Sequence, residues 1–186
     1  MDRIIPLLRY AIWVAIIVAF NSPLSAQGSR TADRSPVDPA DVESVNAIVA
    51  AVYDVISGPA GQERNWDWMR SLFIPGGRLI PTFRDSTGAW RHRVRSVDEW
   101  ITGADPVLVG NGFFERELHR VAERYGNIVH LFSSYDSKRS PEAEPFARGI
   151  NSFQLLYDGL RWWVVTIFWQ AESPDYPIPA EYLPTR

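Results

Sequence analysis

The chain has 186 residues, a formal net charge of −3 and no cysteine. The absence of cysteine excludes disulfides, thiol nucleophiles and thiolate metal sites. The slight acidic excess argues against nucleic acid as a partner, because phosphate binding needs a basic surface.

The first 26 residues are typical of a signal peptide. Arg3 and Arg9 precede an apolar run at residues 10–20, which is shorter than the ~20 residues of a membrane-spanning helix. Leu24-Ser25-Ala26 offers a cleavage site before Gln27. The alternative is an uncleaved anchor helix. We expect export to the periplasm or the medium, with no stable membrane anchor after cleavage.

The next segment leads into the first ordered element. Residues 27–37 are small and polar without any period, so we expect a disordered lead-in. Asp38 is a good N-cap and is followed by proline, which is typical of a helix start. Apolar side chains then recur at helical spacing as far as Ile56. A helix of about five turns is therefore predicted, with Gly58 as its stop.

Two shorter helices and a hairpin are expected next. Residues 63–73 place large apolar side chains on one side of a second helix. The segment 78–96 predicts two strands joined by a tight turn. Ser96 and Glu99 have the spacing of a capping box, which opens a third helix. Pro106 is expected to close that helix.

From Gly112 onward the hydrophobic period changes to two, which predicts four long antiparallel strands. Turns are expected at Tyr125-Gly126 and at Asp158-Gly159, the strongest hairpin signal in the chain. Simple alternation predicts that both faces of the last strand are apolar, with these residues on the two sides: Trp163, Val165, Ile167 and Trp169 on one, Trp162, Val164, Thr166 and Phe168 on the other.

Both apolar faces of the last strand must be shielded from water. Leaving even two aromatic rings in water would cost several kcal/mol, at ~25 cal/mol per Å² of buried apolar surface. One face must therefore meet the helices, and the other must meet a second chain, the proline-rich tail or a ligand. We expect a homodimer formed through the sheet.

Three segments resemble passages of the nuclear transport factor 2-like superfamily, and of its SnoaL-like domains in particular. They are WDWMRSLFIPGGRLIP (66–81), YGNIVHLFSSY (125–135) and RGINSFQLLYDGLRWWVVTIFW (148–169). The resemblance implies an α+β fold in which a curved antiparallel sheet wraps around helices as a cone with a pocket at one end. It assigns residues 38–172 to the SnoaL-like cone domain. Residues 173–186 are rich in proline and have no hydrophobic period, so we expect an extended tail.

The resemblance also implies candidate acid–base residues, since enzymes of this superfamily pair a carboxylate or histidine base with a hydrogen-bond donor. Glu115, Glu117 and His119 alternate along one predicted strand, and His130 falls on the same face of the next strand. His119 or His130 is the candidate general base, with Glu117 as its partner and Tyr53 as donor. The alternative is that this polar face is the solvated back of the sheet.

The candidate ligand-binding residues combine aromatic rings with polar groups: Trp66, Arg148, Asn151, Trp162 and Trp169. Two functions stay open, the binding of a small apolar molecule in an aromatic-lined cone, and a cofactor-free lyase or isomerase acting on a polycyclic or polyketide-like substrate. A third, an interaction module that dimerises or docks through its sheet, needs only the apolar outer face. No cofactor and no metal are expected, because the three histidines lack the spacing of metal ligands on one helix face and no thiolate is available.

Overall fold

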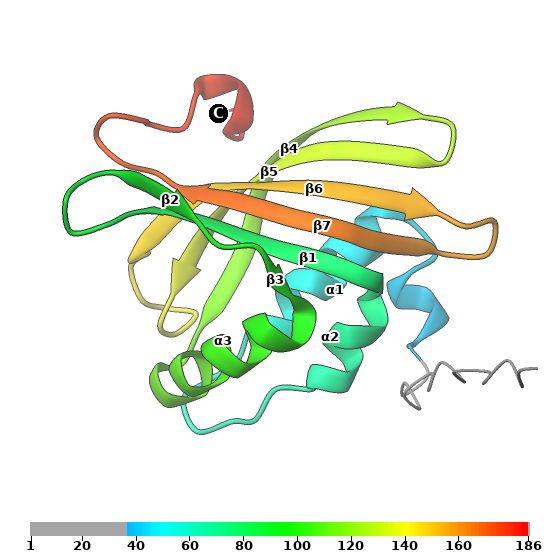
Figure 1. The fold of residues 1–186 in the computed structure, drawn as a ribbon, viewed down its shortest axis with the longest axis horizontal. Coiled ribbons are helices and arrows are strands. Elements are labelled where there is room, and N and C mark those ends of the chain that lie inside the picture. The colour runs from blue at the N-terminus through cyan, green and yellow to red at the C-terminus, as the bar shows by residue number, and fades with distance from the viewer. Residues whose placement is uncertain (1–36, 186) are drawn as a thin grey trace, which may run out of the picture. The chain divides into compact units, whose positions relative to one another are not determined.

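The computed structural model describes residues 37–185 (Figure 1). The predicted signal peptide and all but the last residue of the predicted lead-in lie outside the described residues. The helices are the 3₁₀-helices η1 (Pro39–Asp41) and η2 (Ala180–Tyr182) and the α-helices α1 (Val45–Ile56), α2 (Trp66–Leu72) and α3 (Val97–Asn111). The strands are β1 (Phe73–Arg84), β2 (Trp90–His92), β3 (Arg95–Ser96), β4 (Phe114–Tyr125), β5 (Ile128–Lys138), β6 (Ala147–Tyr157) and β7 (Trp162–Ala171).

The predicted five-turn helix is divided in two. Asp38 caps the short η1 by accepting a hydrogen bond from the Ala40 N–H. A second cap follows, because the Ser44 hydroxyl accepts from the Ala47 N–H and starts α1 there. The apolar stripe of α1 is buried as predicted, so burial against the sheet holds this β-branched segment helical.

The third helix begins as predicted and ends later. The capping box is complete, with Ser96 and Glu99 each accepting from the other's backbone N–H. Pro106 was expected to end the helix, but α3 continues to Asn111. A proline removes one helical hydrogen bond at its own position, and the helix ends only at Gly112, whose φ of 68° suits glycine.

The sheet has the strand order β2-β1-β7-β6-β5-β4, with β3 pairing beside β2 on β1. Both predicted turns join neighbouring antiparallel strands, β4 to β5 and β6 to β7. The sheet is nevertheless mixed, because β1 and β7 pair in parallel. A parallel pair needs a long connection, which here runs through α3 and five strands, so no local turn signal announces it.

Two β-bulges decide which side chains face the helices. One interrupts β4 between Glu117 and His119, and the other interrupts β7 between Val164 and Thr166. Each extra residue reverses the alternation beyond it. The predicted faces of the last strand are therefore wrong: Trp162 and Val164 are buried on the same side as Ile167, whereas Phe168 is 45% exposed.

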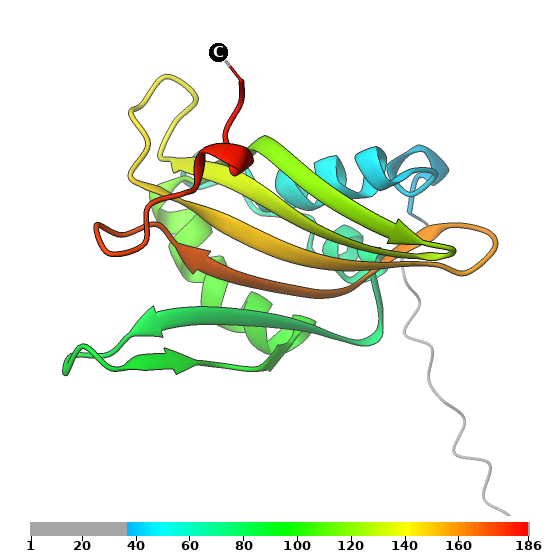
Figure 2. The same ribbon diagram turned by 90° about the horizontal axis from the view of Figure 1, so that it is seen from above.

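The three α-helices lie on one side of the sheet, which we call the inner face, and the C-terminal tail with η2 crosses the opposite, outer face (Figures 1 and 2). Tyr182 packs on Phe132 with ring centroids 5.5 Å apart, and Ile178 is buried. An ion pair between Arg84 and Asp175, at 2.8 Å, ties the tail to β1. The chain's own tail thus covers part of the second apolar face, and the homodimer stays a prediction.

Candidate functional site

A space of about 120 Å³ lies between the inner face and the helices, and we call it the hollow. Most of its lining is apolar and comes from all three α-helices and from the sheet. The lining residues are Val52, Ile56, Met69, Leu79, Trp100, Leu108, Phe113, Glu115, Tyr135, Asn151, Phe153, Ile167 and Trp169. Besides the indoles of Trp100 and Trp169, three of these side chains carry hydrogen-bonding groups: a carboxyl, a phenol and an amide.

Glu115 is the acidic residue of the hollow. Its carboxyl accepts hydrogen bonds from the Ser137 hydroxyl at 2.7 Å and from the Asn151 amide at 3.3 Å. Burial raises the pKa of Glu115 from its ordinary value of 4.5 to about 7, and these two hydrogen bonds offset only part of that effect. Near neutral pH this carboxyl is therefore able to either hold or release a proton.

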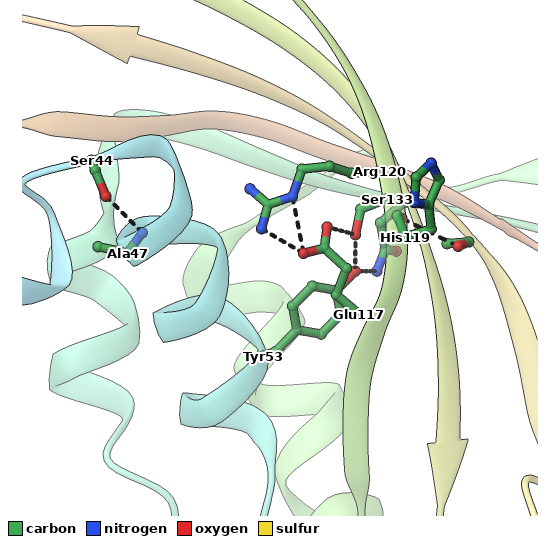
Figure 3. A network of polar contacts seen from close by, with 9 residues as sticks. Ser44, Ala47, Tyr53, Glu117, His119, Arg120 and Ser133 are labelled. Carbon is green, nitrogen blue, oxygen red and sulfur yellow. Dashed lines mark hydrogen bonds and ion pairs between the residues drawn. The ribbon is translucent and has the colours of Figure 1, made fainter. Parts of the chain in front are cut away.

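A chain of hydrogen bonds connects Glu115 with a second carboxylate, Glu117. The Asn151 amide also donates to the Tyr53 oxygen at 3.1 Å, and Tyr53 lies 2.7 Å from the Ser133 hydroxyl. Ser133 in turn donates to Glu117 at 2.6 Å. Figure 3 shows the part of this chain around Tyr53, Ser133 and Glu117.

The direction of this chain follows from its ends. A serine hydroxyl has one proton, and Ser133 gives it to Glu117. Tyr53 must then donate its hydroxyl proton to Ser133 and accept the hydrogen bond from Asn151. The proton of Tyr53 is therefore already engaged. Tyr53 is also buried and does not line the hollow, and burial raises the pKa of its hydroxyl. It positions Asn151 rather than presenting a donor to a ligand.

Tyr135 presents the phenol of the hollow. Its hydroxyl has no hydrogen-bond partner among residues 37–185, and burial raises its pKa, so it keeps its proton. The ring lies over Gly149, where an added Cβ would come within 2.5 Å of the hydroxyl. The missing side chain of Gly149 therefore allows Tyr135 its position beside Glu115.

The two predicted histidine bases lie outside the hollow. The bulge in β4 turns His119 to the outer face, opposite Ser134, and Figure 3 shows it pointing away from the Glu117 carboxylate. His130 is also on the outer face, beside Ser152 at 3.3 Å and edge-on to Phe132. The expectation that both histidines share a face with Glu115 and Glu117 is therefore corrected by the strand register.

The predicted ligand-binding residues divide in a similar way. Asn151 and Trp169 line the hollow. Trp66 lies behind Trp100, edge-on at 6.2 Å, with its indole N–H donating to Asp105. The remaining two do not line the hollow: Trp162 is a buried core residue that contacts Tyr157, and Arg148 pairs with Glu172 at 3.5 Å.

Glu115, Tyr135 and Trp100 are site residues that sequence reasoning did not select. A signal for Glu115 was present, because Phe113 precedes it by two residues and marks that face as apolar at the start of the strand. Tyr135 and Trp100 reach the hollow from segments far apart in the chain. Nothing in their local patterns distinguishes them from ordinary core aromatics.

Metal binding and membrane crossing find no support in residues 37–185. That part of the chain contains no group of three or more His, Asp or Glu side chains placed to hold a metal ion. None of its helices has the length and apolar character needed to span a bilayer.

The fold is similar to solved structures at low sequence identity. A protein of unknown function with a cystatin-like fold from Nostoc punctiforme PCC 73102 is 9% identical, with 73% of this chain and 92% of that chain covered and a TM-score of 0.53. An uncharacterized protein with a cystatin-like fold from Caulobacter vibrioides is 12% identical, with 72% and 90% covered and a TM-score of 0.51. An NTF-2 like protein of unknown function from Silicibacter pomeroyi DSS-3 is 12% identical, with 70% and 94% covered and a TM-score of 0.49.

No protein-family model matches the chain, and no curated protein matches it in sequence. The structural likenesses concern the fold alone. The chain has the α+β cystatin-like fold, with three α-helices against a curved, open sheet, and the predicted nuclear transport factor 2-like fold class is confirmed at that level. What the protein does must be argued from its own hollow.

Proposed function

We propose that this protein binds one compact, mostly apolar small molecule in the hollow. The observation that supports this is a mostly apolar space of about 120 Å³ whose lining includes the carboxyl of Glu115, the phenol of Tyr135 and the amide of Asn151. Ligand sites are commonly apolar with a few polar groups that fix the orientation of the ligand. A carbonyl or hydroxyl group on the ligand would meet these three residues, while its hydrocarbon part contacts the apolar lining.

The volume of the hollow limits the size of the ligand. An engineered apolar cavity of ~150 Å³ in another protein takes one benzene molecule, so about 120 Å³ suits a single small ring or a short branched chain. A polycyclic skeleton exceeds this space. The proposal therefore narrows the ligand class from polycyclic substrates to single-ring or open-chain compounds.

Binding can be tested with cyclohexanone and benzene as probes, following the tryptophan indole resonances by NMR. We expect saturable shifts in the natural protein and their loss in Ile167→Trp, which places an indole in the hollow. The control is Thr166→Trp, on the outer face of the same strand, which should bind as before. Shifts that survive Ile167→Trp, or the absence of saturable binding by both probes, would contradict the proposal.

A second candidate function is proton transfer on a bound carbonyl compound. It is favoured by the Glu115 carboxyl, with its pKa raised to about 7 by burial, next to the protonated Tyr135 hydroxyl. The Glu115 carboxylate would take a proton from the carbon beside the carbonyl, and Tyr135 would donate a hydrogen bond to the oxygen that gains negative charge. If Glu115 returned the proton to the same carbon, the result would be α-proton exchange; with a β,γ-unsaturated ketone, return of the proton to the γ-carbon of the dienolate would shift the double bond and complete an isomerisation without a cofactor.

Exchange of the α-protons of cyclohexanone in D₂O, followed by NMR, tests this second function. Glu115→Gln should lower the enzyme-dependent exchange rate by at least ~100-fold, the usual range for a lost acid–base group. His119→Gln and His130→Gln should keep the rate, because both side chains lie on the outer face. Exchange that depends on either histidine and not on Glu115 would reject this mechanism.

A further inference from the structure

A second space adjoins the hollow on the side of α3. It has a volume of about 330 Å³, and we call it the cleft. Trp100, Leu108 and Trp169 line both spaces, so these three side chains form the wall between them. A ligand that occupies the hollow and extends past this wall would place its other end in the cleft.

The cleft differs from the hollow in charge. Arg93 and Arg95 line it, and its lining includes no aspartate or glutamate. Arg93 lies over the ring of Phe83, with the guanidinium carbon 5.0 Å from the ring centroid, which leaves the edge of the guanidinium free to donate. Arg95 lies against Gly103, where an added Cβ would approach its Nη1 to 2.7 Å, so the glycine makes room for this arginine.

The cleft carries a net positive charge, which suits an anion. Glu99 interacts electrostatically with both Arg78 and Arg95, while its carboxylate accepts the Ser96 N–H in the capping box of α3. Its single negative charge is shared between these two arginines and therefore offsets only part of the charge of Arg95. Guanidinium groups bind a planar carboxylate through paired hydrogen bonds.

We propose that the cleft binds the carboxylate of a small carboxylic acid whose apolar end lies in the hollow. This inference rests on the proposed function, because it needs the hollow to be occupied, and it names the ligand class. The ligand is an acid with a single ring or short chain whose carboxylate lies beyond the wall formed by Trp100, Leu108 and Trp169. The cleft selects for charge, and the hollow selects for size.

Phenylacetate and its neutral analogue phenylacetamide test the inference by calorimetric titration. The natural protein should bind phenylacetate about tenfold more tightly, the equivalent of one charge-assisted interaction. The double variant Arg93→Gln/Arg95→Gln should bind both compounds with the affinity of the amide in the natural protein. Arg93→Gln alone, at an exposed position, should lower the preference by about threefold, which keeps the test available if the double variant does not fold.

Arg91→Gln is the matched control, because it removes the same charge from an exposed position outside the cleft, where Arg91 pairs with Asp85 at 3.0 Å. It should keep the preference for phenylacetate. Equal affinity for the two compounds in the natural protein, or a preference that survives in the double variant, would overturn the cleft assignment while leaving the hollow as a site. If neither compound nor the single-ring probes bind, both the cleft and the proposed function are rejected.

Discussion

Glu115 and Glu117 lie two residues apart on the same face of β4, yet their surroundings differ. Glu117 pairs with Arg120, whose guanidinium donates to the carboxylate, and Glu117 also accepts from Ser133. Glu115 has only the uncharged donors Ser137 and Asn151, and it forms no ion pair within residues 37–185. The Glu117 carboxylate completes a structural network, and the Glu115 carboxylate faces the hollow, which a ligand can enter.

The bulge in β4 causes this difference. In a regular strand, residues three apart point to opposite faces, so Arg120 would lie on the outer face, away from Glu117. The extra residue between Glu117 and His119 brings Arg120 to the inner face, opposite Ser133. One inserted position thus gives Glu117 a cation and removes His119 from the site.

The largest effect on stability is expected at Glu117, because its loss leaves the partly buried Arg120 without a counter-ion. Arg120 and Glu117 have side-chain exposures of only 23% and 19%. Glu117→Gln should lower the free energy of unfolding by about 2–4 kcal/mol, slightly less than is usual for breaking a fully buried pair. Urea denaturation measures this change, and Glu117→Gln/Arg120→Met should recover part of the loss. A cost no larger than that of Glu115→Gln would remove the distinction between the two carboxylates.

Glu115 should instead make stability depend on pH. Its folded-state pKa of about 7 exceeds the ordinary 4.5, so the folded protein binds more protons between these values and stability falls as pH rises through that window. The loss is complete above about pH 7 and amounts to at most ~3 kcal/mol. Denaturation from pH 4 to 8 should show this slope, and Glu115→Gln should remove it. The same pH dependence of stability in the natural protein and in Glu115→Gln would assign that dependence to another titrating group.

Gly149→Ala tests the packing that holds Tyr135 beside Glu115. The new Cβ would overlap the Tyr135 hydroxyl and the Gln170 carbonyl, so we expect a loss of about 2 kcal/mol in the free energy of unfolding. Adding Tyr135→Phe should recover part of it. Gly110→Ala is the control, because a Cβ there meets nothing within 4 Å and should stabilise α3 by up to ~1 kcal/mol. Equal behaviour of the two alanine variants would contradict the predicted overlap.

The smallest effect is expected at Tyr53, which links the two carboxylates through neutral hydrogen bonds. Tyr53→Phe removes its bonds to Ser133 and Asn151 and should cost about 1 kcal/mol of stability. Because Asn151 is then less well held, the affinity for cyclohexanone should fall by about threefold. Tyr157→Phe, which removes an exposed bond to Gly159, is the control and should change neither quantity. Unchanged ligand affinity in Tyr53→Phe would show that Asn151 needs no such support.

Local signals in the sequence predicted the elements whose causes are local. The capping box at Ser96, the hairpins at Gly126 and Gly159 and the apolar stripe of α1 each depend on residues within one or two turns of chain. The order of these elements was enough for the α+β fold class. The cap at Ser44 was not predicted and the end of α3 was placed too early at Pro106, because a cap or a proline shifts a helix boundary only as far as the surrounding packing permits.

The site depended on features that no short segment contains. The sequence by itself determined that Glu115, Glu117 and His119 are spaced for one strand face and that aromatic side chains exceed what one core face needs. The two bulges and the parallel pairing of β1 with β7 were decided by the tertiary structure. The physical reason is that a bulge depends on the register that packing selects between strands, and a hollow depends on side chains that only the folded chain brings together.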